Sequence, residues 1–129
     1  MKPIEFTKEM KILAMSFNKD FTEETLELWY SHFMNINITI FKKAIQDTIV
    51  SKKYIPTIAE LLDMCKKEQV NMKLSIIDIM AHNGYFKTEK EYQKTIKWIE
   101  KDITPEWLLV DMQNQYKKEL SNERVMIGG

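Results

Sequence analysis

The sequence predicts an all-α protein of about seven short helices, with a compact helical N-terminal bundle followed by a C-terminal helical segment. Three observations support this fold class. Apolar residues recur at helical spacing along most of the chain, polar capping residues precede these segments, and only three glycines occur in 129 residues. Sheets joined by glycine turns are therefore disfavoured.

The first three helices are expected to begin at polar caps. Thr7 is the expected cap of the first helix and Thr22 that of the second, which has two glutamates in its first turn, where carboxylates interact favourably with the helix dipole. Either Asn37 or Thr39 can cap the third. The expected inner positions are Met10, Leu13, Ala14 and Phe17, then Leu26, Trp29, Tyr30 and Phe33, then Ile40, Ala44, Ile45, Thr48 and Ile49.

The fourth helix has the clearest start in the sequence. Pro56 cannot continue the preceding helix, and Thr57 and Glu60 have the spacing of a capping box, in which each side chain accepts a hydrogen bond from the backbone N–H of the other residue. Residues 1–66 are therefore expected to form a four-helix N-terminal domain. Its expected scaffold and core residues are Trp29, Phe33, Pro56, Thr57, Ile58, Glu60 and Leu61.

The second half of the chain is expected to hold three further helices over residues 71–121. The polar stretch 66–69 breaks the apolar pattern and marks a soft boundary. The fifth helix runs from about Asn71 to His82 and stops at Asn83-Gly84, although a buried strand is the alternative for this β-branched run.

Two more starts follow. Thr88 and Glu91 have capping-box spacing ahead of a sixth helix, and Pro105 suits the first position of a seventh. Residues 122–129 are expected to form a flexible tail. The expected inner faces of these two helices are Tyr92, Ile96, Ile99 and Ile103, then Leu108, Leu109, Met112, Tyr116 and Leu120.

The composition gives no indication of catalysis, a cofactor or a metal. Two histidines and one cysteine lack the spacing of metal ligands, and there is no glycine-rich phosphate loop or nucleophile elbow. Nineteen basic residues balance nineteen acidic ones and only Arg124 is an arginine, so sequence-specific nucleic-acid binding is not expected. No apolar run is long enough to span a membrane, and a lone cysteine fits a reduced, cytoplasmic setting.

Apolar residues that lie off the inner faces gather late in the chain. Trp98 is about 100° from Ile99 on a helical wheel, and Trp107 and Val110 lie opposite the inner row of the seventh helix. Exposed tryptophans often anchor protein partners. We therefore expect a partner-binding surface, although the same residues could instead pack the two halves together. The candidate residues are Tyr85, Phe86, Trp98, Trp107 and Val110.

The first half, over about residues 7–66, resembles the phage replicative helicase loader-and-inhibitor family. The resemblance depends on Phe17-Asn18-x-x-Phe21-Thr22-Glu23-Glu24, on Leu28-Trp29-Tyr30 with Phe33 and Ala44, and above all on Tyr54-Ile55-Pro56-Thr57-Ile58-Ala59-Glu60-Leu61. It implies an all-helical adaptor that contacts the replicative helicase or its AAA+ loader, of the phage or of the host, in the host cytoplasm. In the family, the second half carries helicase binding.

Two other functions stay open at this point. The lysine pairs at 42–43, 52–53, 66–67 and 117–118 could contact phosphates in a nucleic-acid-binding replication accessory protein, whose affinity would fall steeply with salt. A small phage regulatory protein that self-associates through the late aromatic residues is the other alternative. The sequence does not distinguish loading of the helicase from its inhibition, because both begin with the same contact.

Overall fold

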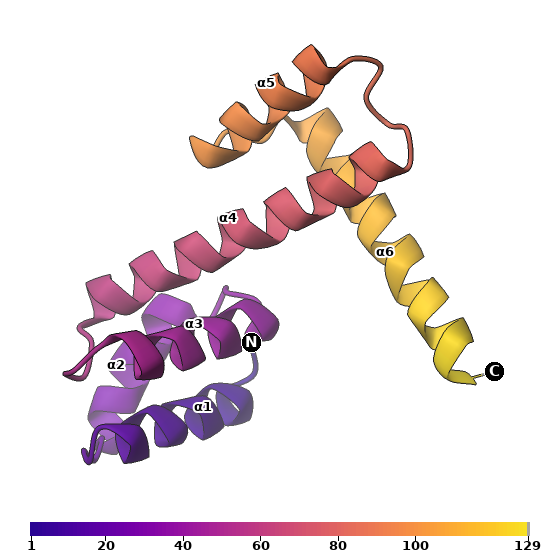
Figure 1. Ribbon diagram of the computed structural model, residues 1–129. Coiled ribbons are helices and arrows are strands. Elements are labelled where there is room, and N and C mark those ends of the chain that lie inside the picture. The colour runs from indigo at the N-terminus through magenta and orange to yellow at the C-terminus, as the bar shows by residue number, and fades with distance from the viewer. Residues whose placement is uncertain (129) are drawn as a thin grey trace. The chain divides into compact units, whose positions relative to one another are not determined.

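The computed structural model describes the backbone of residues 1–128 and the side chains of residues 1–117. The described chain contains six α-helices and no strand, which confirms the all-α fold class and excludes a strand over residues 71–82 (Figure 1). Two compact units divide between Gln69 and Val70. Unit 1 comprises residues 1–69 and unit 2 comprises residues 70–129, and each is described by itself.

Unit 1 consists of α1 (Pro3–Ser16), α2 (Glu23–Phe33), α3 (Ile38–Ser51) and the first part of α4 (Ile58–His82). Aromatic rings fill its core. Phe33 and Phe41 lie 5.4 Å apart between ring centroids, and Phe6 packs 5.6 Å from Phe41. Each such pair contributes about 0.5–1.5 kcal/mol beyond the area that it buries. Among the expected scaffold residues, Trp29, Phe33, Pro56 and Leu61 are buried, Ile58 is half-buried, and Thr57 and Glu60 are exposed at the helix start.

The first helix begins earlier than predicted. Pro3 occupies its first turn, where no N–H donor is needed, and Glu5 Oε1 accepts from the backbone N–H of Lys2 at 2.9 Å. Thr7 is therefore not the cap but lies inside the helix, where its hydroxyl donates to the Pro3 carbonyl oxygen at 2.9 Å. The earlier start places Phe6 in the core, a residue that the expected inner face left out.

The other caps of unit 1 form at predicted positions. Thr22 Oγ1 accepts from the N–H of Thr25 at 3.1 Å, and the cap of α3 is Asn37, whose side chain accepts from the N–H of Thr39 at 2.8 Å. Both hydrogen bonds of the capping box at the start of α4 are present. Thr57 N–H donates to Glu60 Oε1 at 3.1 Å, and Glu60 N–H donates to Thr57 Oγ1 at 3.2 Å.

The predicted fourth and fifth helices are one continuous helix. α4 extends over 25 residues from Ile58 to His82, through the stretch 66–69 that was expected to separate them. Lysine, glutamate and glutamine are good helix formers, so a break in the apolar pattern here does not break the backbone. The seventh predicted helix accordingly becomes the sixth observed one. Whether the units are independently folding domains stays a prediction.

Unit 2 consists of the second part of α4 with α5 (Glu89–Glu100) and α6 (Glu106–Gly128). Gly84 ends α4 with φ +78°, as the Asn-Gly stop predicted. The expected tail over 122–129 and the side chain of Leu120 lie outside the residues whose side chains are described. The buried core, to which all three helices contribute, consists of Ile77, Met80, Ile99, Leu108 and Met112.

Two predicted inner faces extend less far than expected. α5 ends at Glu100, and Asp102 adopts a left-handed φ of 60°, so Ile103 leaves the helical stripe and is 50% exposed. On α6, Leu109 and Tyr116 flank the buried pair Leu108 and Met112 and are 37% and 43% exposed. The helix starts one residue after Pro105, whose carbonyl oxygen accepts from Leu109 N–H at 2.9 Å. No helix within the described residues combines the length and hydrophobicity that a membrane span requires.

Candidate functional site

A groove on unit 2 brings together four of the five residues proposed to bind a partner. Its volume is about 350 Å³. This value lies at the low end of the ~300–1,000 Å³ range of ligand sites. The fifth residue, Val110, lies outside the groove, three positions after Trp107 on α6, and is 49% exposed. The groove is lined by Tyr85, Phe86, Lys87, Glu91, Lys94, Thr95, Trp98 and Trp107.

The loop after α4 sets one wall of the groove. The left-handed Gly84 reverses the chain, and Tyr85 N–H then donates to the Met80 carbonyl oxygen at 3.0 Å. The Tyr85 hydroxyl donates to Asp111 Oδ2 of α6 at 2.6 Å, which ties the loop to that helix. Burial and the hydrogen bond to Asp111 raise the pKa of Tyr85 to about 12, so the hydroxyl stays a donor at neutral pH. The ring of Phe86 stands edge-on to Tyr85, with centroids 5.0 Å apart.

The opposite wall is a pair of tryptophans from two helices. The rings of Trp98 on α5 and Trp107 on α6 meet edge to face, with centroids 6.4 Å apart and an interplanar angle of 79°. The reversal at Asp102 makes this possible because it returns the chain toward the end of α5, where Ile103 N–H donates to the Trp98 carbonyl oxygen at 2.8 Å. Trp98 is half-buried, whereas Trp107 is 56% exposed. The pair therefore holds a large exposed aromatic surface in a fixed position.

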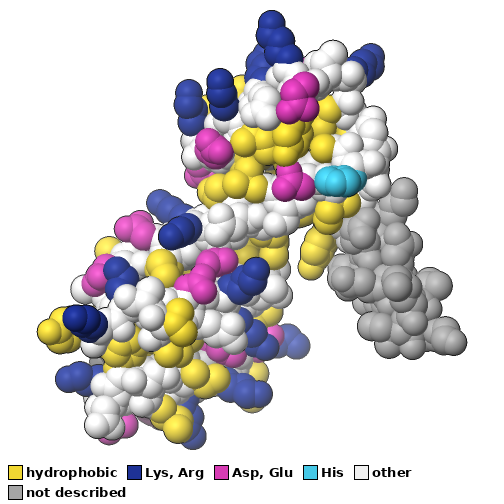
Figure 2. Space-filling view, viewed as in Figure 1, with side chains coloured by type: hydrophobic (Ala, Val, Ile, Leu, Met, Phe, Trp, Pro, Cys, Tyr) yellow, Lys and Arg dark blue, Asp and Glu magenta, His cyan; other side chains and the backbone are white. Residues whose placement is uncertain are grey.

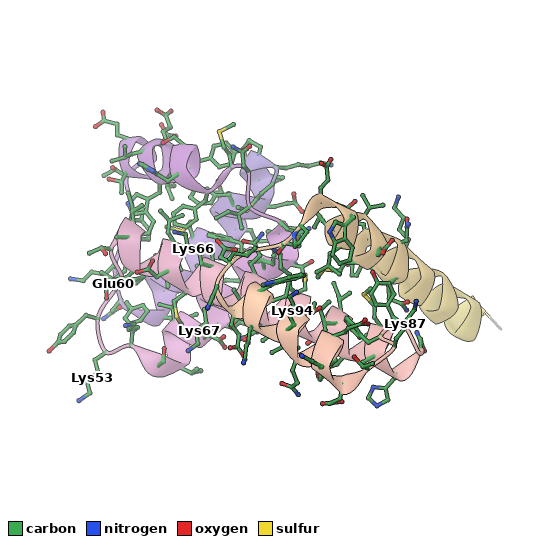
Figure 3. The ribbon with its side chains drawn as sticks, turned by 90° about the horizontal axis from the view of Figure 1, so that it is seen from above. Lys53, Glu60, Lys66, Lys67, Lys87 and Lys94 are labelled. Carbon is green, nitrogen blue, oxygen red and sulfur yellow. The ribbon has the colours of Figure 1, made fainter. Side chains whose placement is uncertain are left out.

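Two lysines lie at the rim of this aromatic surface (Figure 3). Lys94 Nζ lies 5.1 Å from the centroid of the Trp98 ring, which is a cation–π contact. Lys87 precedes α5, and its backbone N–H donates to Glu91 Oε2 at 3.2 Å. Within the part of the chain whose side chains are described, neither lysine forms an ion pair. The sequence did not single out these lysines, because only the loop and the turn of α5 bring them to the aromatic residues.

A second hollow, of about 430 Å³, adjoins the groove and shares Phe86 and Lys87 with it. It is more polar. The Tyr92 hydroxyl donates to Asp78 Oδ1, which raises the pKa of Tyr92, and His82 Nδ1 lies 2.9 Å from the Asp78 carbonyl oxygen. On the face of unit 2 in the upper part of Figure 2, hydrophobic side chains are bordered by charged ones. Asp78 and His82, both expected at the solvent edge of the helix, are exposed.

The described side chains include no group of three or more histidine, cysteine, aspartate or glutamate residues that could hold a metal ion. In the hollow, His82 faces a backbone carbonyl, and the Asp78 carboxylate accepts from a tyrosine hydroxyl. The groove itself is built from aromatic rings, two ammonium groups and one carboxylate. This arrangement suits recognition of an apolar surface bearing charge.

Comparison with known proteins bears on unit 1. Residues 1–62 match the family model for the N-terminal domain of the gene 39 protein. No curated protein and no solved structure matches the chain. The matched residues include the three N-terminal helices and the capping box of α4, and they end before the groove of unit 2.

Proposed function

Because residues 1–62 belong to this N-terminal domain family of phage helicase loaders and inhibitors, we propose that this protein is a phage DNA-replication adaptor. It binds the replicative helicase or the AAA+ loader of that helicase in the cytoplasm of the bacterial host. It controls helicase delivery, by loading or by inhibition, through protein contacts and without catalysis of its own.

The observation that supports a contact through unit 2 is the tryptophan pair of the groove. Trp107 is 56% exposed although its ring is held in place by Trp98, so it offers apolar surface without needing to be ordered on binding. Tryptophan is the residue type most enriched among the side chains that dominate interface energies. Val110 extends the same apolar surface along α6.

Unit 1 offers less surface of this kind. Its aromatic residues Phe6, Phe33 and Phe41 are fully buried and pack on one another, and the Thr57–Glu60 pair is engaged in capping. One exposed aromatic side chain of unit 1, Tyr54, is 82% exposed in the loop before α4 and makes no ring contact within the described residues. Unit 1 is therefore proposed as the scaffold.

A pull-down with purified helicase and with purified loader tests the proposal. The wild-type protein is expected to capture one of them, and Trp107→Ala is expected to weaken that capture by roughly 30-fold, which is the effect of a hot-spot residue worth about 2 kcal/mol. Tyr54→Ala is the matched control, since it removes an exposed aromatic side chain from unit 1. Circular dichroism of both variants checks that they fold.

Two results would contradict the proposal. Capture of neither protein by the wild type would exclude the adaptor function. Capture that is lost with Tyr54→Ala and kept with Trp107→Ala would place the contact on unit 1 instead of unit 2.

A further inference from the structure

We propose that the groove of unit 2 accepts a segment of the partner that carries a large apolar side chain next to an acidic one. This inference rests on the proposed function and specifies the chemistry of the partner. The apolar side chain would contact the aromatic residues of the groove, and the carboxylate would lie against Lys87 and Lys94.

The apolar part of the argument comes from the walls of the groove. Phe86 and Trp98 are half-buried and Trp107 is exposed, so each ring leaves part of its surface uncovered. Thr95 is 4% exposed, and its hydroxyl already donates to the Glu91 carbonyl oxygen at 2.9 Å, so it places no unmet polar demand on an occupant. A large apolar side chain in this space gains burial without leaving a polar group unpaired.

The charge of the rim selects an acidic neighbour for that side chain. The groove is lined by two lysines and one acid, Glu91, whose carboxylate already accepts the backbone N–H of Lys87 at 3.2 Å. Neither ammonium group has an ionic partner among the described side chains. Lys94 Nζ, 5.1 Å from the centroid of the Trp98 ring, lies where the aromatic wall meets the rim. A carboxylate at this edge meets uncompensated positive charge, whereas a basic group would be repelled.

The neighbouring surface favours a protein segment over a small molecule. Apolar exposure continues beyond the groove to Val110 on α6 and to Ile103 in the preceding turn, at 49% and 50%. A small molecule confined to the groove would leave this surface uncovered, whereas a chain segment could cover it. The adjoining hollow contains the acids Asp78 and Glu89, so the acidic group of the segment is expected at the groove and not there.

The first test compares charge variants in binding to the helicase or loader captured by the wild type. Association and dissociation rates are measured by biolayer interferometry. The double variant Lys87→Glu with Lys94→Glu is expected to associate about tenfold more slowly at low salt, and the difference is expected to shrink at high salt because ions screen the attraction. Lys87→Arg with Lys94→Arg keeps both charges and is expected to bind like the wild type.

A matched control separates local from overall charge. Lys53→Glu with Lys66→Glu changes the net charge by the same amount, at exposed lysines of unit 1 that also form no ion pair within the described residues (Figure 3). It is expected to bind within about twofold of the wild type. If a glutamate variant fails to fold, as judged by circular dichroism, Lys87→Gln with Lys94→Gln takes its place, with a smaller expected loss.

The second test identifies the acidic group directly. A carbodiimide forms an amide, with loss of water, between a lysine amine and a carboxylate that are in contact. Applied to the complex and read by mass spectrometry, it is expected to join Lys87 or Lys94 to an aspartate or glutamate that lies within a few positions of a large apolar residue of the partner.

The outcomes distinguish the two proposals. If the wild type captures its target but the groove variants bind like the unit 1 control, or if cross-links form only at other lysines, the acidic segment is excluded while the adaptor function stands. If Trp107→Ala binds normally as well, the groove is excluded altogether. Failure of the wild type to capture either target overturns the adaptor function and this inference with it.

Discussion

The Glu68 carboxyl group on α4 leads to a prediction about the pH dependence of stability in unit 1. Its side chain is 7% exposed. A hydrogen bond with Asp47 of α3, burial and the charge of Asp47 raise the pKa of Glu68 above its ordinary value of 4.5, against the opposing charges of Lys43 and Lys67. A raised pKa means that the folded state favours the protonated carboxyl. This stabilisation is fully present below the ordinary pKa and is lost as the pH rises through the raised one.

The substitution Glu68→Gln imitates the protonated form. Its amide can donate to Asp47 at every pH, as the protonated Glu68 does in acid. At neutral pH the wild type has two carboxylates facing each other with no proton between them, so the variant gains a hydrogen bond to a charged group, worth about 1.5–3 kcal/mol. It loses attraction to two lysines, at about 0.5 kcal/mol each. The net expectation is a gain of about 1 kcal/mol in the free energy of unfolding at neutral pH and no gain near pH 4.

Urea denaturation at several pH values measures this difference. Trp29 is the only tryptophan of unit 1, so substituting Trp98 and Trp107 by phenylalanine lets tryptophan fluorescence report that unit alone. Glu27→Gln, at an exposed position of α2, is the control and is expected to leave stability unchanged at all pH values. A Glu68→Gln protein that is less stable than the wild type at neutral pH, or whose advantage is the same in acid, would refute the reasoning.

Three further substitutions test other features. Thr48→Val removes a fully buried hydroxyl that has no hydrogen-bond partner within the described residues, and is expected to raise the free energy of unfolding by about 1 kcal/mol in urea denaturation. Thr57→Ala removes the cap of α4 and is expected to lower it by about 1 kcal/mol in the same assay, and an unchanged value would exclude a role for the box. Gly84→Ala introduces a Cβ that meets no atom within 4 Å, but at φ +78° the backbone strain alone is expected to cost about 1 kcal/mol, seen as a lower melting temperature of unit 2.

The sequence predicts the local events of this fold well because short-range chemistry determines them. Caps at Thr22, Asn37 and Thr88 each use a side chain and a backbone N–H two or three residues away, and the stop at Gly84 depends on one residue. These interactions need no knowledge of the rest of the chain. The first helix was misjudged because Pro3 and a threonine one turn later both resemble starts, and burial of Phe6 decides between them.

The length of α4 was missed because hydrophobic pattern and backbone continuity were treated as one signal. The stretch 66–69 changes which side chains are buried, yet residues 58–82 contain no glycine or proline that would end a helix. That absence was the available indication of a single helix. Glu68, within the polar stretch, is itself buried against α3.

The candidate site was predictable only in part. Apolar residues left off the helical stripes pointed to Trp98 and Trp107, which the structure places in ring contact. Their charged neighbours were not predictable, because Lys87 and Lys94 reach the groove through the loop after Gly84 and the reversal at Asp102. The bond between Tyr85 and Asp111 likewise joins residues 26 positions apart, a separation without a local sequence signal.

The single cysteine of the chain is buried in unit 1, at 3% exposure on α4. Burial, with a further contribution from the charge of Glu68, raises the pKa of the Cys65 thiol to about 12, so almost no reactive thiolate exists in the closed structure. A thiol reagent can therefore modify this sulfur only when the surrounding helices separate. Since unit 2 contains no cysteine, the rate of modification under native conditions measures the opening of unit 1 alone, and it can be followed while unit 2 is bound to a partner.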